Sequence, residues 1–194
     1  MNGSLAADLR NLHAQLDAID QELQIVIAGL REEEGNCQPQ PGSWSISECL
    51  DHLATGNRVY LEAMQEPIRR ARVLGRHRSR PALPGLIGRL FVRSFEPPPT
   101  WWTRRKSPRI IRPRNTRSLG DTLADLVDSH QAIRAFLLAH ADLDLARIRF
   151  PNPFVRGIRF SIATGLQLLA AHERRHLWQA LQVRRRLQEN EGRS

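Results

Sequence analysis

The sequence predicts an all-α protein built as a four-helix bundle. Apolar residues recur at steps of three and four in four separate segments, which is the spacing of one helix face. Proline and glycine gather between these segments, and no segment shows the sustained apolar–polar alternation of a half-buried strand. A chain of 194 residues can bury one good core and is short for two, so we expect a single domain over residues 1–194.

The first helix is predicted from Leu5 to Leu30. Its inward-facing row of apolar residues, called its seam below, comprises Leu5, Leu9, Leu12, Leu16, Ile19, Leu23, Val26 and Leu30. The pattern stops near "EEEGN", where Gly35 suits a helix exit. The turn-rich stretch "QPQPGS" then follows as a connector.

The second helix is predicted to start at "SWSISE". Ser45 and Glu48 have the spacing of a capping box, and Trp44 just before them suits a hydrophobic staple. The seam comprises Ile46, Leu50, Leu53, Asn57, Tyr60 and Met64. Pro67 should kink or end this helix, although some helix can continue to Gly75.

A basic, proline-rich segment, residues 75–118, separates the second and third helices. This connector holds 12 Lys/Arg, one acidic residue (Glu96) and seven of the twelve prolines. Within it, "PGLIGRLFVRSF" suits a short helix, whereas "EPPPTWW" cannot be helical. A connector of this length can cross the bundle and let the flanking helices run parallel, which predicts an up-down-down-up arrangement.

The third and fourth helices are predicted over residues 118–140 and 161–187, with a connector containing two prolines between them. Ser118 and Asp121 suit a cap at the start of the third helix. The third seam comprises Leu119, Leu123, Leu126, His130, Ile133 and Leu137. The fourth comprises Ile162, Gly165, Leu169, His172, His176, Gln179 and Val183.

The fourth seam therefore turns polar at three successive positions, His172, His176 and Gln179. An unsatisfied polar side chain in a core costs roughly 1–3 kcal/mol. Histidines at i and i+4 project from one helix face and can bind one cation, which would satisfy them. The alternative is that one or both histidines border the core and bond to carboxylates or water.

The string "HERRH" also matches the His-Glu-x-x-His motif of zinc peptidases. One peptidase class needs a glycine and a further histidine downstream, where this chain has Gln179 and Gln182. The other class needs a glutamate ligand on a separate helix, and Glu189 and Glu191 lie in the polar tail. We therefore rank a zinc peptidase low.

Two other histidines are candidates for a third ligand. His52 borders the seam of the second helix next to Leu53, and His130 lies on the third seam. The remaining histidines lie off the seams or in connectors and are interpreted as surface residues; they are His13, His77 and His140.

Two motifs resemble those of the DinB/YfiT-like family of metal-binding four-helix bundles. In that family, Trp-Ser-x-x-Glu-x-x-x-His on the second helix is completed by His-x-x-x-His-x-x-Gln on the fourth. The matching residues here are Trp44, Ser45, Glu48, His52, His172, His176 and Gln179. The resemblance spans all four predicted helices and includes the basic connector.

The resemblance implies an up-down-down-up bundle, often a homodimer, with a divalent metal on His52, His172 and His176. Zinc and nickel are the favoured metals, with open positions for water or substrate. The activities of relatives include thiol-dependent transfer or isomerisation, and metal-dependent hydrolysis has been proposed; several relatives are stress-induced. His130 is outside the family pattern, and we predict that it lies near the metal without binding it.

Four further residues have open roles. Glu48 is expected either to orient His52 or only to cap its helix, and Gln179 to orient an imidazole. For Glu173 a surface pair with a nearby arginine is the favoured interpretation, with a role as general base as the alternative, and His130 is a second catalytic candidate. Cys49 faces the core and is a weaker ligand candidate, because buried thiols usually only pack.

The connector has three interpretations. We rank a solvated arginine-rich loop first, a rim that attracts anionic substrates to the metal second, and a nucleic-acid site using Trp101 and Trp102 third. Two cysteines, no signal-peptide pattern and no membrane-length apolar run lead us to expect a cytoplasmic protein that does not enter membranes.

The leading functional hypothesis is a metal-dependent enzyme that activates a small thiol or water at three histidines, as a transferase or hydrolase. The main alternative is a non-catalytic bundle in which the metal is structural or serves a stress response. Nucleic-acid binding through the connector is the third hypothesis. An exchangeable ligand position at the metal distinguishes the enzyme from the non-catalytic bundle.

Overall fold

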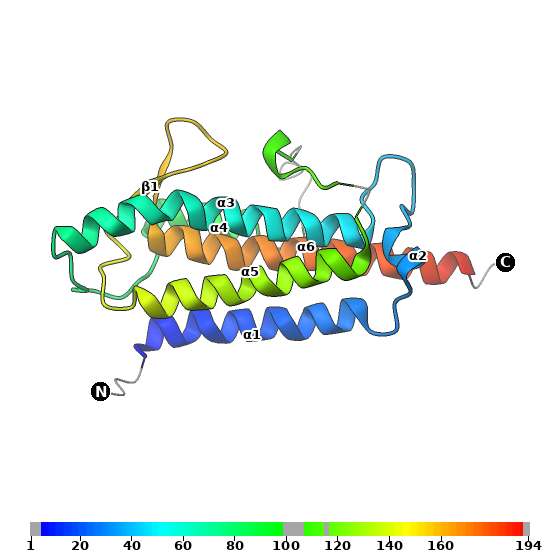
Figure 1. Ribbon diagram of the computed structural model, residues 1–194, viewed down its shortest axis with the longest axis horizontal. Helices are drawn as coiled ribbons and strands as arrows, with labels where there is room; N and C mark the ends of the chain where they lie inside the picture. Colours follow the sequence, from blue (N-terminus) through cyan, green and yellow to red (C-terminus); the bar gives the residue numbers. More distant parts are fainter. Residues whose placement is uncertain (1–4, 99–106, 115–116, 192–194) are drawn as a thin grey trace.

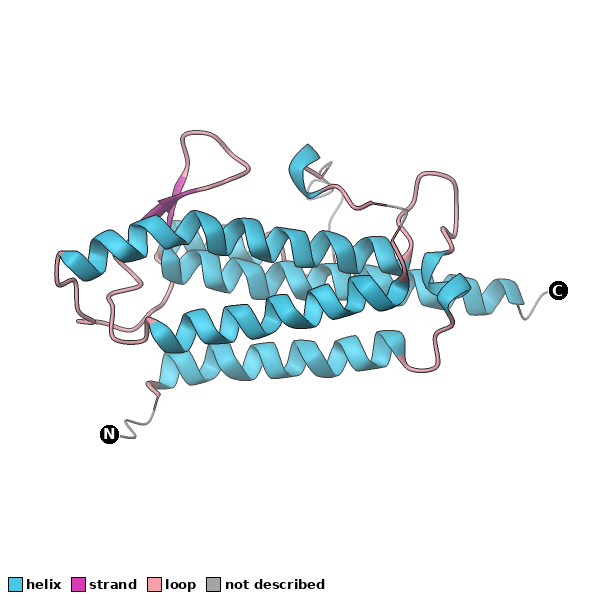
Figure 2. Ribbon diagram, in the orientation of Figure 1, coloured by secondary structure: helices cyan, strands magenta, loops and turns pink. Residues whose placement is uncertain are grey.

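The computed structural model describes residues 5–98, 107–114 and 117–191, and this part of the chain is mostly helical. Its α-helices are α1 (Ala7–Ile27), α2 (Glu32–Asn36), α3 (Ile46–Val73), α4 (Leu86–Arg93), α5 (Leu119–Ala139) and α6 (Ile162–Glu191). A 3-10 helix, η2 (Arg109–Ile111), and two strands, β1 (Arg149–Pro151) and β2 (Arg159–Ser161), complete the described elements. The all-α prediction is confirmed (Figure 2).

The four long helices α1, α3, α5 and α6 lie alongside one another (Figure 1). α3 packs against both α5 and α6, and α1 packs mainly against α6. The colour gradient in Figure 1 shows that α1 and α6 advance from left to right, whereas α3 and α5 advance from right to left. α3 and α6, which carry the sequence-predicted histidine motifs, are therefore direct neighbours.

The core follows the predicted seams. The α1 seam residues Leu16, Ile19 and Leu23 are each about 1 % exposed, and each side chain of this size contributes roughly 1.5–3 kcal/mol when fully buried. On α6, a Cβ at Gly165 would overlap Met64 and Phe150, so glycine lets these side chains reach the helix backbone. Within the described residues, every helix is too short or too polar to cross a membrane.

The predicted caps are present, but the end of the first helix differs from the prediction. Ser45 and Glu48 form the capping box of α3, and the Ser118 hydroxyl accepts a hydrogen bond from the Asp121 backbone N–H. α1 ends at Ile27, earlier than predicted, and Gly29 adopts a left-handed φ of 67° before α2 begins as a separate helix. α3 continues through Pro67 to Val73.

The short helix predicted in the connector is present as α4. Its Phe91 and Val92 pack against the core, and α4 contacts α6. Further along, the connector forms η2, whose Ile111 is buried. Most of "EPPPTWW", including Trp101 and Trp102, lies outside the described residues.

The segment before α6 contains a small hairpin that we did not predict. β1 and β2 pair antiparallel, with Phe150 opposite Phe160 (Figure 2). Each strand is only three residues long, which is too short for an alternation pattern to register in the sequence. The hairpin presents the buried Phe150 ring to Tyr60 of α3, with ring centroids 5.8 Å apart.

Candidate metal centre

Three histidine side chains from two helices converge at one point. The structure brings together His52 from α3 with His172 and His176 from α6, and one ligand nitrogen of each lies within 4.8 Å of the other two. The ring centroids form a nearly equilateral triangle with sides of 4.9, 4.5 and 4.6 Å. The i, i+4 spacing places His172 and His176 on one face of α6, and His52 reaches them from α3.

A backbone carbonyl fixes the tautomer of His52. The His52 Nδ1 atom lies 2.6 Å from the Ile111 oxygen, and a carbonyl oxygen can only accept a hydrogen bond. Nδ1 therefore carries the proton, which leaves the lone pair of Nε2 directed at His172, whose Nε2 is 3.1 Å away. Metal-binding histidines in proteins typically donate their second ring N–H to such an acceptor.

All three imidazoles favour the neutral form. Burial lowers the pKa of His52, although the Ile111 carbonyl opposes that shift. Burial also holds the pKa of His172 and His176 well below the ordinary value, and the positive charge of Arg175 lowers both further. A neutral imidazole is the form that binds a metal, so this charge state suits a cation site.

The donor set fits a divalent metal. Zinc binds imidazole nitrogen at about 2.0–2.1 Å with tetrahedral geometry, which separates two ligand atoms by roughly 3.3 Å. The 3.1 Å between the Nε2 atoms of His52 and His172 is close to that separation. The Nδ1 atom of His176 is buried without a hydrogen-bond partner, so the group as it stands has an unmet polar requirement.

Trp44 packs against the three-histidine group. Our interpretation of Trp44 as a helix staple did not predict this contact. Its ring lies 4.8 Å from that of His52 and 5.6 Å from that of His176, with an angle of 27° to the His176 plane. An indole packed on two imidazoles restricts their rotation and shields them from water on that side. The Trp-Ser pair of the family motif was the only sequence signal for this position.

Glu48 and Gln179, the two residues predicted to orient the histidines, differ in their contacts. The Glu48 carboxylate accepts hydrogen bonds from the Ser45 backbone N–H and the Gln38 amide, so its observed contacts are those of a cap. The Ile111 carbonyl is the group that orients His52. Gln179 lies beside His176 and partly opposes the lowering of its pKa.

Glu173 is buried, which overturns the surface-pair interpretation. Its side chain is 0 % exposed, and its Oε1 accepts a hydrogen bond of 2.6 Å from the Asn57 amide. Its Oε2 lies 3.3 Å from His130 Nε2, and His130 Nδ1 lies 2.6 Å from the Asp20 carboxylate. Glu173 and His130 therefore lie within ion-pair distance of each other inside the bundle, and we call this group, with Asn57 and Asp20, the His130 network.

A cavity of about 930 Å³ opens onto the three histidines. Aromatic residues form much of its wall; they include Trp44, Tyr60, Phe91, Phe95, Phe154 and Trp178. Neither Glu173 nor His130 lines this cavity, so their placement does not support the predicted role of either as a base acting on substrate. It also argues against a zinc-peptidase mechanism, in which the glutamate of the His-Glu-x-x-His motif must reach the substrate.

The cavity wall has an excess of positive charge. Among its described lining residues are Arg112, Arg175 and Arg186, whereas Glu48 is the single acidic one. The Arg175 guanidinium lies over the Phe95 ring, 5.9 Å from its centroid. Since Arg112 and Ile111 come from the connector, this segment forms part of the site, as the rim interpretation expects.

The remaining candidate ligand, Cys49, is fully buried, and burial raises the pKa of its thiol. It is absent from the group of converging ligand atoms, as are the three histidines interpreted as surface residues. One of these, His77, is exposed in a bridge to Leu143.

Comparison with known proteins gives one match. The model of a protein family described as the DinB superfamily matches residues 15–180, a range that starts within α1 and ends within α6. No curated protein and no solved structure matches the chain.

Proposed function

The chain belongs to the DinB superfamily, and from that premise we propose that it is a metal-dependent enzyme whose three histidines hold a divalent cation. The reaction we propose is the activation of a small thiol or of water for transfer or hydrolysis. The observation that carries this proposal is the convergence of His52, His172 and His176 on the wall of a large cavity. A site that opens to a cavity can exchange one ligand, as catalytic metal sites do.

A divalent cation bound at this site would act as a Lewis acid and lower the pKa of a thiol or water molecule. The protein itself supplies orientation, through the Ile111 backbone carbonyl and the Trp44 side chain. Ile111 holds His52 in the tautomer whose Nε2 can bind a cation, and Trp44 packs against His52 and His176. With three neutral nitrogen ligands, we propose zinc or nickel as the metal.

The cavity wall favours an anionic substrate. Arg175 lies close enough to lower the pKa of His172 and His176, so its charge also acts on a molecule bound beside them. Phe95 and Phe154 offer apolar contacts for the body of that molecule. We therefore propose a small thiol or ester bearing a carboxylate, attracted by Arg175 and the connector.

The other parts of the proposal concern the whole protein. We propose that residues 1–194 form one domain, an up-down-down-up bundle, and that two copies pair, as the family resemblance implies. Cys37 and Cys49 are both free, which suits a reducing compartment such as the cytoplasm. We do not favour nucleic acid as a partner, because the described basic residues at the site line the cavity that opens onto the three histidines.

The alternative is a non-catalytic metal-binding bundle. One observation favours it: Glu173 and His130, the two catalytic candidates, bind each other away from the cavity. In that case the cation serves structure or a stress response, and a filled coordination shell with no exchangeable ligand is expected.

A thiol-consumption assay tests the proposed function. Metal-loaded protein, metal-stripped protein and the His176→Ala variant are each mixed with mercaptoacetate and an alkylating electrophile, and free thiol is followed. We expect catalysed loss of thiol with loaded protein only. Metal-loaded protein that never exceeds the uncatalysed rate, for the thiols and for ester hydrolysis, would favour the non-catalytic bundle.

A further inference from the structure

A buried carboxylate next to His52 holds the connector in place. We infer that Asp51 is a positioning residue: by binding the connector at Arg114 and Arg117, it places the Ile111 carbonyl on His52 and so presents His52 Nε2 to the cation. The inference rests on the proposed function in one respect, since it is the proposed cation that gives the orientation of His52 a purpose.

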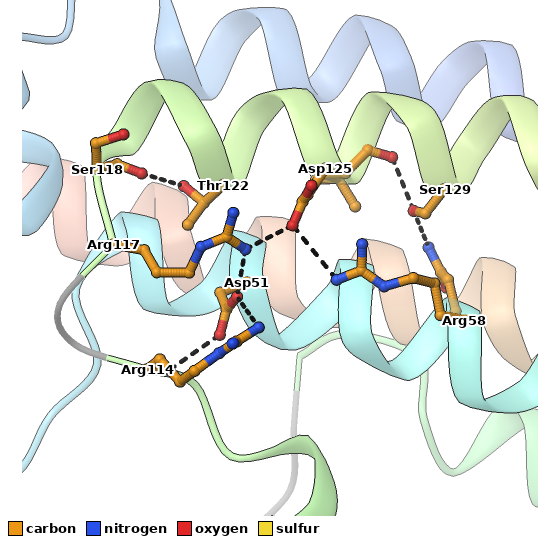
Figure 3. Close-up of polar contacts among 10 residues, drawn as sticks. Asp51, Arg58, Arg114, Arg117, Ser118, Thr122, Asp125 and Ser129 are labelled. Carbon is orange, nitrogen blue, oxygen red and sulfur yellow. Dashed lines mark hydrogen bonds and ion pairs between the residues drawn. The ribbon is translucent and has the colours of Figure 1, made fainter.

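The contacts of Asp51 divide between backbone and side chain. Its Oδ2 accepts a hydrogen bond of 2.9 Å from the Arg114 backbone N–H, and its Oδ1 accepts one of 3.0 Å from the Arg117 guanidinium. Figure 3 shows Asp51 on α3 between these two connector residues. The backbone bond fixes the path of the chain, because it does not depend on the rotamer of Arg114.

A second carboxylate completes the attachment. The Arg117 guanidinium also binds Asp125 of α5, and Asp125 receives a further contact of 3.4 Å from Arg58 (Figure 3). Arg117 therefore bridges α3 and α5 at the point where the connector returns to the bundle. The connector residues that precede this point are tied to both helices.

Burial makes this attachment specific. Asp51 is about 1 % exposed, and a buried carboxylate without partners is strongly disfavoured. The connector must therefore supply its N–H and its guanidinium in register, which leaves few alternative positions for the chain. Arg114 and Arg117 are much more exposed, so Asp51 is the fixed member of the group.

The attachment is close to the carbonyl that orients His52. Ile111 lies three residues before Arg114, and Pro113 between them restricts the backbone. Ile111 is itself buried and ends the η2 turn. Asp51 and His52 are adjacent on α3, so a shift of the connector on Asp51 would move the Ile111 oxygen relative to His52 Nδ1, where the hydrogen bond is only 2.6 Å long.

The test compares Asp51→Asn with Asp125→Asn in the full chain. Both changes replace a carboxylate partner of Arg117 by a neutral amide. Only at Asp51 does the carboxylate also accept the Arg114 backbone N–H, and an amide, with one oxygen in place of two, keeps at most one of these two connector contacts. Nitrogen-15 NMR of the metal-stripped protein reports the tautomer of His52, whose signals are assigned by their loss in His52→Gln. Zinc affinity is measured by competition with a chelator.

We expect wild-type His52 to be protonated at Nδ1 alone, and Asp51→Asn to give a mixture of tautomers. Zinc affinity should fall about 10–100-fold, as it does when outer partners of metal-binding histidines are removed. Asp125→Asn should keep the wild-type tautomer and change the affinity less than about threefold, because its side chain is partly exposed. Helical circular dichroism identifies any variant that fails to fold, and Arg117→Gln then replaces Asp51→Asn.

A single Nδ1–H tautomer in folded Asp51→Asn, or in Arg117→Gln where that variant replaces it, would overturn the inference whatever the zinc affinity. Wild-type protein that binds no zinc, yet whose His52 tautomer changes in Asp51→Asn, would defeat the proposed function and leave the role of Asp51 standing.

Discussion

The bundle contains two groups of buried or half-buried histidines that differ in their partners. At the metal centre, His172 faces two other imidazoles and an open cavity. One residue further along α6, Glu173 points to the His130 network inside the bundle. Adjacent positions on a helix lie about 100° apart, so one turn of α6 contributes to both groups.

Burial lowers the imidazole pKa in both groups, and the neighbouring side chains decide the direction of the net shift. Burial alone lowers an imidazole pKa, as it does for His52, His172 and His176. For His130 the Glu173 and Asp20 carboxylates outweigh burial and raise the pKa. The metal centre therefore favours neutral imidazoles that can bind a cation, whereas the His130 network favours the protonated form of its imidazole.

The largest expected effect concerns metal content. Purified protein should hold about one divalent metal per chain, and replacing His52, His172 or His176 by alanine should reduce it to near zero. His130→Ala is the matched control, because its imidazole bonds to carboxylates, and it should keep most of the metal. Full metal in His52→Ala, measured by elemental analysis, would mean that the ligand on α3 is wrongly assigned.

The next effect concerns stability. His130→Ala should lower the free energy of unfolding of metal-stripped protein by about 3–5 kcal/mol, because it leaves the buried Glu173 carboxylate without its His130 partner. His13→Ala, at a partly exposed histidine paired with Asp17, should change it by less than about 1 kcal/mol. Urea unfolding measures both. Equal losses would show that the His130 network contributes no more than a surface pair.

The two groups should also give opposite pH dependence. His130 has a raised pKa when folded, so its stabilisation is complete below the unfolded value of about 6.5 and is lost as pH rises through the folded value. The histidines of the metal centre have lowered pKa values, so in metal-stripped protein their contribution is lost as pH falls below about 6.5. Urea unfolding from pH 5 to 9 should show His130→Gln losing the alkaline decline and keeping the acidic one. An unchanged alkaline decline would contradict the assignment.

The smallest expected effect concerns the substrate charge. Replacing Arg175 by glutamine should weaken binding of mercaptoacetate to the metal-loaded protein about tenfold, because a charge-assisted contact is lost. Binding of uncharged mercaptoethanol should hardly change. Arg185→Gln is a matched control, since Arg185 is exposed on the same helix and does not line the cavity. An equal loss for both thiols would remove the argument for an anionic substrate.

The sequence predicted what helix periodicity can determine. The seams identified the buried faces, the Ser45 and Ser118 caps were correct, and the position of His130 inside the bundle followed from its seam. The grouping of His52 with His172 and His176 came from the family resemblance, because a seam position does not fix which residues on two helices lie at the same height.

The site contacts that could not be predicted from the sequence involve the long connector and a second buried face of α6. Periodicity gives no register for the connector, so the Ile111 carbonyl and the attachment at Asp51 could not be predicted. Glu173 lies off the seam and was therefore expected at the surface. α6 packs against α1, α3 and α4, and this leaves it with more than one buried face.

The central claim is that three neutral imidazoles bind the cation and that His130 does not. X-ray absorption spectroscopy of the zinc-loaded full chain counts the imidazole ligands directly, and repeating it on His130→Ala tests the fourth histidine. We expect three imidazoles in both proteins, with the oxygen of a water molecule or the sulfur of an added thiol completing the coordination. Four imidazoles in the wild type and three in His130→Ala would contradict it, as would a spectrum without imidazole scattering.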